Sequence, residues 1–179
     1  MGRRKTPREP APPADQGTIG GASGDRGTAL RLYLDSSALV KLYVVEEGSP
    51  LVRTAVDRAG MVATSALAYV EARAAFARRR QEGAMTAEDH RRVVRLLDVD
   101  WARYAVVEVS EGLIREAARL AERHRLRAYD AIHLASATAI RDRVGEPMVL
   151  AAWDQPLEKA AKNEGLGLLR SPRRPPASP

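Results

Sequence analysis

Apolar and polar positions follow two different periodicities between residues 30 and 169. Short runs of β-prone apolar residues predict strands at 30–34, 61–63, 104–109 and 148–152, and "LGLL" gives a possible fifth strand. Longer segments between them carry apolar residues three and four positions apart, as in the face formed by Leu113, Ala117 and Leu120, and predict helices. Strands that alternate with helices in this way predict an α/β fold with a central parallel sheet of four to five strands, covered on both faces.

Polar residues and glycines mark where several of these helices begin and end. Ser65, Thr86 and Ser110 stand directly before helical segments, as expected for N-caps. Gly83 stands where the helix after Ser65 should end. The same reasoning places two short helices at about 36–45 and 49–58.

The two ends of the chain differ in composition from this central region. Residues 1–29 are rich in Pro, Gly and Arg and contain one large aliphatic side chain, Ile19. Residues 170–179, "RSPRRPPASP", have a similar composition. Such segments bury too little apolar surface to offset the entropy of ordering. We therefore expect a disordered tail at 1–29, one domain at 30–169, and a disordered basic tail at 170–179.

Charge and composition exclude several classes of protein. The net charge of the 179 residues is +6, but residues 30–169 hold 21 basic and 20 acidic side chains, so charge alone is weak support for a nucleic-acid partner. The absence of cysteine excludes disulfides, thiolate zinc sites and cysteine nucleophiles. No apolar stretch approaches the roughly 20 residues of a membrane span, and no apolar leader is present, so we expect a cytoplasmic protein without a membrane partner.

Four acidic residues occupy positions that suggest a catalytic or metal-binding role. Asp35 follows the first strand and Asp154 the fourth, and ligands of parallel sheets bind beyond the carboxyl ends of the strands. Glu71 interrupts a run of small apolar residues, and Asp130 lies in the first turn of a helix with few polar residues. Each also has a structural explanation: the three aspartates as helix caps, and Glu71 as a residue of a solvated helix face.

The four acids acquire a different meaning if they share one cleft. Like charges at such a short distance repel one another, so a shared cleft would require a cation to offset the repulsion. Oxygen ligands without cysteine suit magnesium (Mg²⁺) or manganese (Mn²⁺). Such a site can activate a water molecule for attack on phosphorus, so no protein nucleophile is needed.

Four segments carry a family resemblance: "YLDSSALVKLY", "TSALAYVEARAAFARR", "LRAYDAIHLASA" and "AAWDQPLEKAAKNEGL". In that order they resemble the four signature blocks of PIN-domain ribonucleases, closest to the VapC-type toxins of prokaryotic type II toxin–antitoxin systems. The resemblance covers residues 30–169. It implies a PIN-like three-layer α/β/α sandwich, often paired as a homodimer, that cleaves structured RNA with Mg²⁺ or Mn²⁺ and is neutralised by a cognate antitoxin.

The resemblance also assigns residues to the site. Its four acids, which would hold the metal and act in catalysis, fall on Asp35, Glu71, Asp130 and Asp154. The family's hydroxyl two residues after the first acid falls on Ser37, which would hold Asp35 or a metal-bound water; Ser36 is the lesser candidate. Asp154 remains open as either a metal ligand or a helix cap. The 29 residues before the first strand depart from family members that begin almost at that strand.

Other interpretations stay open. The domain could be a catalytically inactive PIN scaffold that binds RNA or a partner protein. It could also be a phosphotransfer domain, although an aspartyl phosphatase would need a second Asp where Ser37 stands. We interpret His133, three residues after Asp130, as a packed, hydrogen-bonded histidine rather than a metal ligand. Trp101 and Tyr104 are interpreted as packing residues rather than as platforms for bases.

Overall fold

The computed structural model describes residues 29–170 of the chain. The two predicted tails therefore lie outside the described residues, except for Ala29 and Arg170, and the tail boundaries stay predictions. Between residues 29 and 170 the chain forms one all-parallel sheet in the order β3-β2-β1-β4-β5. Its strands are β1 (Leu30–Leu34), β2 (Ala59–Ser65), β3 (Ala105–Val107), β4 (Val149–Ala151) and β5 (Gly167–Leu168).

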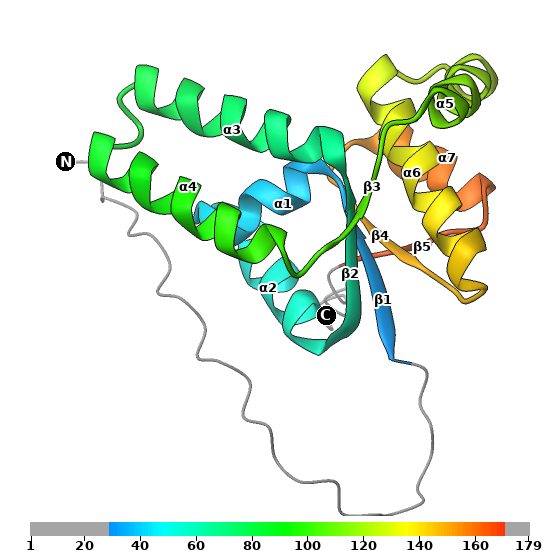
Figure 1. The fold of residues 1–179 in the computed structure, drawn as a ribbon, viewed down its shortest axis with the longest axis horizontal. Helices are drawn as coiled ribbons and strands as arrows, with labels where there is room; N and C mark the ends of the chain where they lie inside the picture. The colour runs from blue at the N-terminus through cyan, green and yellow to red at the C-terminus, as the bar shows by residue number, and fades with distance from the viewer. Residues whose placement is uncertain (1–28, 171–179) are drawn as a thin grey trace, which may run out of the picture.

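Seven helices in the described region cover the two faces of the sheet. They are α1 (Ser36–Tyr43), α2 (Ser49–Arg58), α3 (Ala66–Gln81), α4 (Ala87–Trp101), α5 (Glu111–His124), α6 (Ala128–Val144) and α7 (Gln155–Asn163). Helices α1 to α4 lie on one side of the strands and α5 to α7 on the other (Figure 1). The predicted three-layer α/β/α sandwich is thus confirmed. No helix between residues 29 and 170 combines the length and apolar character needed to cross a membrane.

The central strand β1 shows why the core divides into two halves. Its side chains alternate between the faces of the sheet, as in any strand. Leu32 and Leu34 pack into the cluster beneath α1 to α4, whereas Tyr33 packs into the cluster beneath α5 to α7. All three side chains are fully buried. A parallel strand covered on both faces has a nearly continuous apolar sequence, as in "LRLYL". Its one charged residue, Arg31, lies in the partly buried first half of the strand and forms an ion pair with Glu146.

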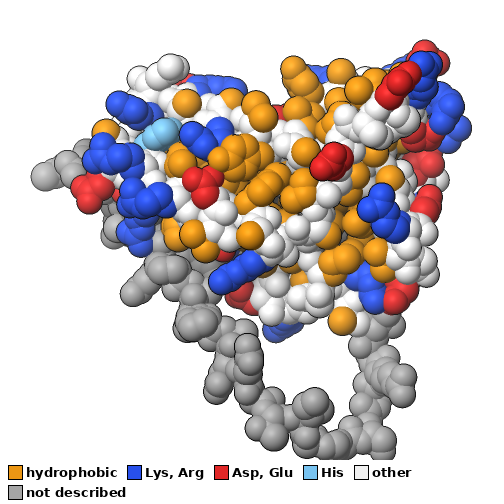
Figure 2. Space-filling model, viewed as in Figure 1, with side chains coloured by type: hydrophobic (Ala, Val, Ile, Leu, Met, Phe, Trp, Pro, Cys, Tyr) orange, Lys and Arg blue, Asp and Glu red, His pale blue; other side chains and the backbone are white. Residues whose placement is uncertain are grey.

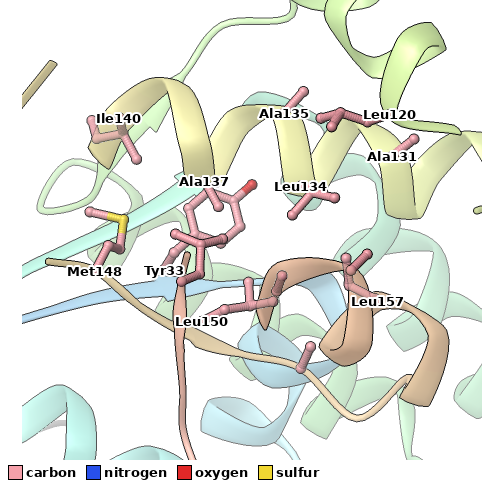
Figure 3. Packing of buried hydrophobic residues seen from close by; sticks show 14 of the residues in the cluster. Tyr33, Leu120, Ala131, Leu134, Ala135, Ala137, Ile140, Met148, Leu150 and Leu157 are labelled. Carbon is pink, nitrogen blue, oxygen red and sulfur yellow. The ribbon is translucent and has the colours of Figure 1, made fainter. Parts of the chain in front are cut away.

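The second half of the core is formed mainly by α6. Figure 3 shows the Tyr33 ring beside α6, with Leu134 and Ala137 above it and Leu150 of β4 nearby. Helix α6 is buried on most sides because the sheet, α5 and α7 all pack against it. Its polar residues at the N-terminal end therefore lie in a largely apolar setting.

Several predicted limits were wrong by a few residues. The first helix ends at Tyr43 rather than near residue 45, because Val44 is already extended at φ −115° and ψ 130°. Strand β2 is longer than predicted because Ala59 pairs with Leu30, whereas β3 and β4 are shorter than predicted. The predicted caps Ser65, Thr86 and Ser110 are confirmed, since each side chain accepts a hydrogen bond from a backbone N–H of its helix.

Apolar and charged side chains are unevenly distributed over the face of the molecule that Figure 2 shows. Hydrophobic side chains gather over the middle of the face, whereas many Lys and Arg side chains lie over the far ends of α3 and α4 and over α5 (Figure 2). Val70 on α3 and Val99 on α4 are each more than 60% exposed. The exposed surface of α3 and α4 therefore includes apolar as well as charged side chains.

Candidate functional site

All four predicted acids line one pocket at the carboxyl edge of the sheet. The pocket has a volume of about 270 Å³ and is lined by Asp35, Ser36, Ser37, Glu71, Asp130, His133, Trp153 and Asp154. The acids come from four places in the fold: the end of β1, the middle of α3, the first turn of α6 and the end of β4. Parallel strands bring these sequence-distant segments to the same edge.

Asp35 is the most buried of the four acids, with 6% of its surface exposed. One carboxylate oxygen, Oδ1, accepts a hydrogen bond from the Ala38 N–H at 2.7 Å and so caps α1. The Ser37 hydroxyl donates to the same carboxylate, at 2.8 Å from Oδ1 and 3.0 Å from Oδ2. Burial raises the pKa of Asp35 to about 6, although His133 and the two hydrogen-bond donors oppose the shift. Asp35 is therefore both a helix cap and a member of the pocket.

Glu71 is held by two neighbours from other elements. The Ser36 hydroxyl donates to its Oε2, and His133 Nε2 lies 2.8 Å from the same oxygen. Burial pushes the pKa of Glu71 upward, but the hydrogen bonds from His133 and Ser36 outweigh it, so the pKa lies below its usual value. The structure thus places Glu71 in the pocket rather than on a solvated helix face.

His133 connects this acid to the core. Its ring is 3% exposed, and its Nδ1 lies 3.1 Å from the Tyr33 hydroxyl. Burial raises the pKa of Tyr33, so the hydroxyl keeps its proton. In the neutral ring, Nδ1 accepts from Tyr33 and Nε2 donates to Glu71. The prediction of a packed, hydrogen-bonded histidine is confirmed, but its link to Glu71 was missed because the two residues lie 62 positions apart in the chain.

Asp130 and Asp154 form the other side of the pocket. Asp130 lies in the first turn of α6, and burial, followed by the charge of Asp154, raises its pKa above the usual value. Asp154 Oδ1 accepts a hydrogen bond from the Leu157 N–H at 3.0 Å, which caps α7. The cap predicted for Asp154 is therefore present, and the same residue also lines the pocket.

The donors in this pocket suit a hard divalent cation in chemistry and charge. They are carboxylate and hydroxyl oxygens, and no Lys or Arg in the described part of the chain forms an ion pair with Asp35, Asp130 or Asp154. Within residues 29–170, however, no three Asp, Glu or His side chains already stand together as a metal-coordinating group. The pocket thus brings together the right side chains without arranging them as a preformed coordination shell.

Trp153 is an aromatic member of the pocket that the sequence reasoning did not single out. Its side chain is partly exposed, and Lys41 Nζ lies 4.7 Å from its ring centroid. A Cβ atom on Gly48 would lie 2.5 Å from Trp153 Cζ2, so glycine permits this close approach. By contrast, the rings of Trp101 and Tyr104 pack edge to face with their centroids 6.1 Å apart, as predicted for packing residues.

Comparisons with known proteins agree with this geometry. The PIN domain family model matches residues 32–144, a range that includes three of the four acids. Ribonuclease VapC45 of Mycobacterium tuberculosis (strain CDC 1551 / Oshkosh) is 38% identical over 135 residues, which cover 75% of this chain and 91% of the relative. Ribonuclease VapC46 of Mycobacterium tuberculosis (strain ATCC 25618 / H37Rv) is 31% identical over 138 residues, which cover 77% and 95%.

Solved structures share the fold at lower sequence identity. The crystal structure of PAE2754 from Pyrobaculum aerophilum superposes with a TM-score of 0.55 at 21% identity and covers 79% of this chain and 85% of that one. VapBC2 from Rickettsia felis, bound to a DNA fragment from its promoter, gives a TM-score of 0.53 at 13% identity and covers 78% and 97%. Together with the family match and the two ribonuclease relatives, the sheet order and the acidic pocket lead to one conclusion: the chain belongs to the PIN domain family, among its VapC-type members.

Proposed function

We propose that the chain is a Mg²⁺- or Mn²⁺-dependent endoribonuclease that cleaves structured RNA and acts as the toxin of a type II toxin–antitoxin system. The observation that carries this proposal is the convergence of Asp35, Glu71, Asp130 and Asp154 on one pocket. The names of the relatives, Ribonuclease VapC45 and VapC46, support ribonuclease activity.

The side chains of the pocket have separable roles in this proposal. The four carboxylates would hold the cation, which when bound lowers the pKa of a water molecule and stabilises the charge on the leaving oxygen. The Ala38 N–H and the Ser37 hydroxyl fix the orientation of the Asp35 carboxylate. His133 and the Ser36 hydroxyl keep Glu71 ionised and aimed into the pocket.

Among the described residues that line the pocket, none has a hydroxyl that is free to act as a nucleophile. The Ser36 hydroxyl donates to Glu71, and the Ser37 hydroxyl donates to Asp35. Both serines therefore serve the carboxylates, which agrees with hydrolysis by water. The partly exposed Trp153 ring offers a flat apolar wall on which a base next to the cleaved bond can stack.

The direct test is cleavage of a structured RNA by the purified protein with Mg²⁺ or Mn²⁺. The double variant Asp35→Asn with Asp130→Asn should lose about 10³-fold or more in rate, because the cation would lose two of its ligands. A control with Glu88→Gln and Glu122→Gln removes the same charge at exposed sites and should cleave normally. Undiminished cleavage by the first variant would rule out the mechanism.

A second candidate function is an inactive scaffold that binds RNA or a protein. The observation in its favour is that no three acidic or histidine side chains between residues 29 and 170 form a ready coordination group. Calorimetric titration with Mn²⁺ separates the two functions, because a scaffold has no need of a cation in this pocket. Saturable binding that disappears in the Asp35 and Asp130 double variant would support the nuclease.

We also propose a cognate antitoxin, a homodimeric assembly and a cytoplasmic location. The exposed Val70 and Val99 give α3 and α4 apolar surface that a protein partner can cover. Expression of the chain should arrest growth, and co-expression of the antitoxin should relieve the arrest. Light scattering on the purified chain tests the homodimer, for which a monomer at micromolar concentration is the contrary result.

A further inference from the structure

A basic groove lies between the C-terminal end of α5 and helix α7. It has a volume of about 590 Å³, and its polar lining residues are Arg123, His124, Arg125, Gln155, Lys159 and Asn163. We propose that this α5–α7 groove binds backbone phosphates of the RNA substrate beside the bond that is cleaved. The inference rests on the proposed ribonuclease function and adds a substrate-binding site to it.

The charge of the groove suits a polyanion. Arg123 and His124 share one acid, Glu164, whose Oε1 lies 3.1 Å from Arg123 Nη1 and 2.6 Å from His124 Nε2. In the described part of the chain, Arg125 and Lys159 form no ion pair. These two cations are therefore available to neutralise phosphates and to release the counterions around them.

The groove and the acidic pocket are lined by residues that are neighbours in the chain. Gln155 lines the groove and Asp154 lines the pocket, and consecutive Cα atoms are only about 3.8 Å apart. Arg127 follows Arg125 by two residues, and its positive charge acts on Asp130 of the pocket. In this proposal, a phosphate chain that leaves the pocket beside Asp154 meets the cations of the groove next.

The backbone of Arg125 gives an independent reason to regard its side chain as functional. Its φ of 54° makes it the only residue other than glycine with a left-handed backbone between residues 29 and 170. It stands directly after α5, where glycine is the usual residue, and Gly83 and Gly145 occupy such left-handed positions after α3 and α6. Strain that persists in an arginine is typical of a position where the side chain itself is needed.

The test measures binding of a fluorescein-labelled RNA hairpin in chelator, by fluorescence anisotropy over a range of salt concentrations. The variant Arg125→Glu with Lys159→Glu should raise the Kd at least about tenfold in about 0.1 M salt. It should also reduce the slope of log K against log salt by about 1.4 to 1.8, the value for two phosphate contacts. A matched control, Arg58→Glu with Arg95→Glu, reverses two exposed cations on the opposite face of the sheet and should leave the Kd within about threefold.

A second variant separates binding from folding. Arg125→Gly relieves the left-handed strain, so the melting temperature should rise by about 2 to 4 °C. Its Kd for the hairpin should nevertheless rise about threefold or more. Higher stability together with weaker RNA binding would support the proposal, because a residue with only a structural role cannot produce both changes.

Other results would overturn the inference. If the wild-type protein cleaves the hairpin but the Arg125 and Lys159 variant binds it like the control, the groove proposal fails and the ribonuclease function stands. If that variant keeps its RNA affinity but loses binding of the purified antitoxin, the groove is a protein site. If the wild-type protein neither binds nor cleaves RNA, the proposed function fails and the groove proposal fails with it.

Discussion

Asp35 stands just before α1 and Glu46 a few residues after it, and their surroundings shift the pKa values of the two carboxylates in opposite directions. Glu46 lies 2.7 Å from Lys41 Nζ and also forms an ion pair with Arg79. Burial pushes the pKa of Glu46 upward, but Lys41 and Arg79 outweigh it and hold the pKa below its usual value. Asp35 is more deeply buried, and its hydrogen-bond donors within residues 29–170 are the neutral Ala38 N–H and Ser37 hydroxyl. Burial raises its pKa to about 6.

We expect this difference to separate a structural acid from one that serves the proposed metal site. A carboxylate that loses water contact and serves only the fold is normally matched by cations, as the partly buried Glu46 is. Asp35 shares its pocket with three other acids, and none of the pocket's lining residues is a Lys or Arg. Negative charge collected without matching protein cations favours an external cation, which agrees with the proposed metal site. The following changes test this contrast, beginning with the largest expected effect.

Glu46→Gln should be strongly destabilising. The substitution leaves the Lys41 side chain, which is 9% exposed, without its anion. Breaking a fully buried pair on one side costs about 3 to 5 kcal/mol, and the 24% exposure of the Glu46 side chain places this pair at the lower end of that range. Urea unfolding monitored by circular dichroism measures the free energy, with exposed Glu47→Gln as the control. Equal stability of the two variants would remove the structural role of this ion pair.

Asp35→Asn should act in the opposite direction and stabilise the protein at pH 7.5 in the absence of divalent cations. Asparagine can still accept the Ala38 N–H as a helix cap, but it carries no charge to bury. A pKa of about 6 in place of 3.8 corresponds to a gain of up to about 3 kcal/mol. Asp142→Asn, at a side chain that is 67% exposed, is the control. Loss of stability in the Asp35 variant would contradict the description of the pocket.

The gain from Asp35→Asn should depend on pH with a definite sign. Since the folded protein binds the Asp35 proton more tightly than the unfolded chain does, the proton stabilises the fold below pH about 4. The wild type should lose this stability as the pH rises from about 4 through about 6, while the variant should not. Urea unfolding of both proteins across this range gives the difference curve, which should be flat above pH about 7.

His133→Ala should weaken Mn²⁺ binding about tenfold, because Glu71 loses the donor that keeps it ionised and oriented. Calorimetric titration measures this affinity without reference to RNA cleavage. His90→Ala, which changes a histidine on α4, is the control. Tyr33→Phe keeps the imidazole and should have a smaller effect. Unchanged affinity in the His133 variant would leave the ring a packing role only.

Ser37→Ala should have the smallest effect. Asp35 loses one hydrogen bond to its charged form, worth about 1 kcal/mol, so its pKa should rise by less than about one pH unit. NMR titration of the Asp35 carboxyl carbon measures the change. Ser36→Ala, whose hydroxyl serves Glu71 instead, is the matched control. A lower pKa in the Ser37 variant would reverse its assigned role.

Local patterns predicted more of the fold than of the site. The alternation of strands and helices and the caps Ser65, Thr86 and Ser110 depend on residues a few positions apart, and the structure agrees with them. The ends of the strands were less well predicted, because pairing with a neighbouring strand decides where a strand begins, as at Ala59 opposite Leu30. The four acids were predicted with the help of a family resemblance, and the pocket brings them together.

The sequence by itself determined the order and type of the elements, the exclusion of cysteine chemistry and the identity of the candidate acids. Only the tertiary structure decided which acid is matched by a cation and which is not. It also decided that His133 reaches Glu71 and, across 100 positions of sequence, Tyr33. Helix periodicity and capping act within a few residues, whereas desolvation and Coulomb energies depend on neighbours in space, whatever their separation along the chain.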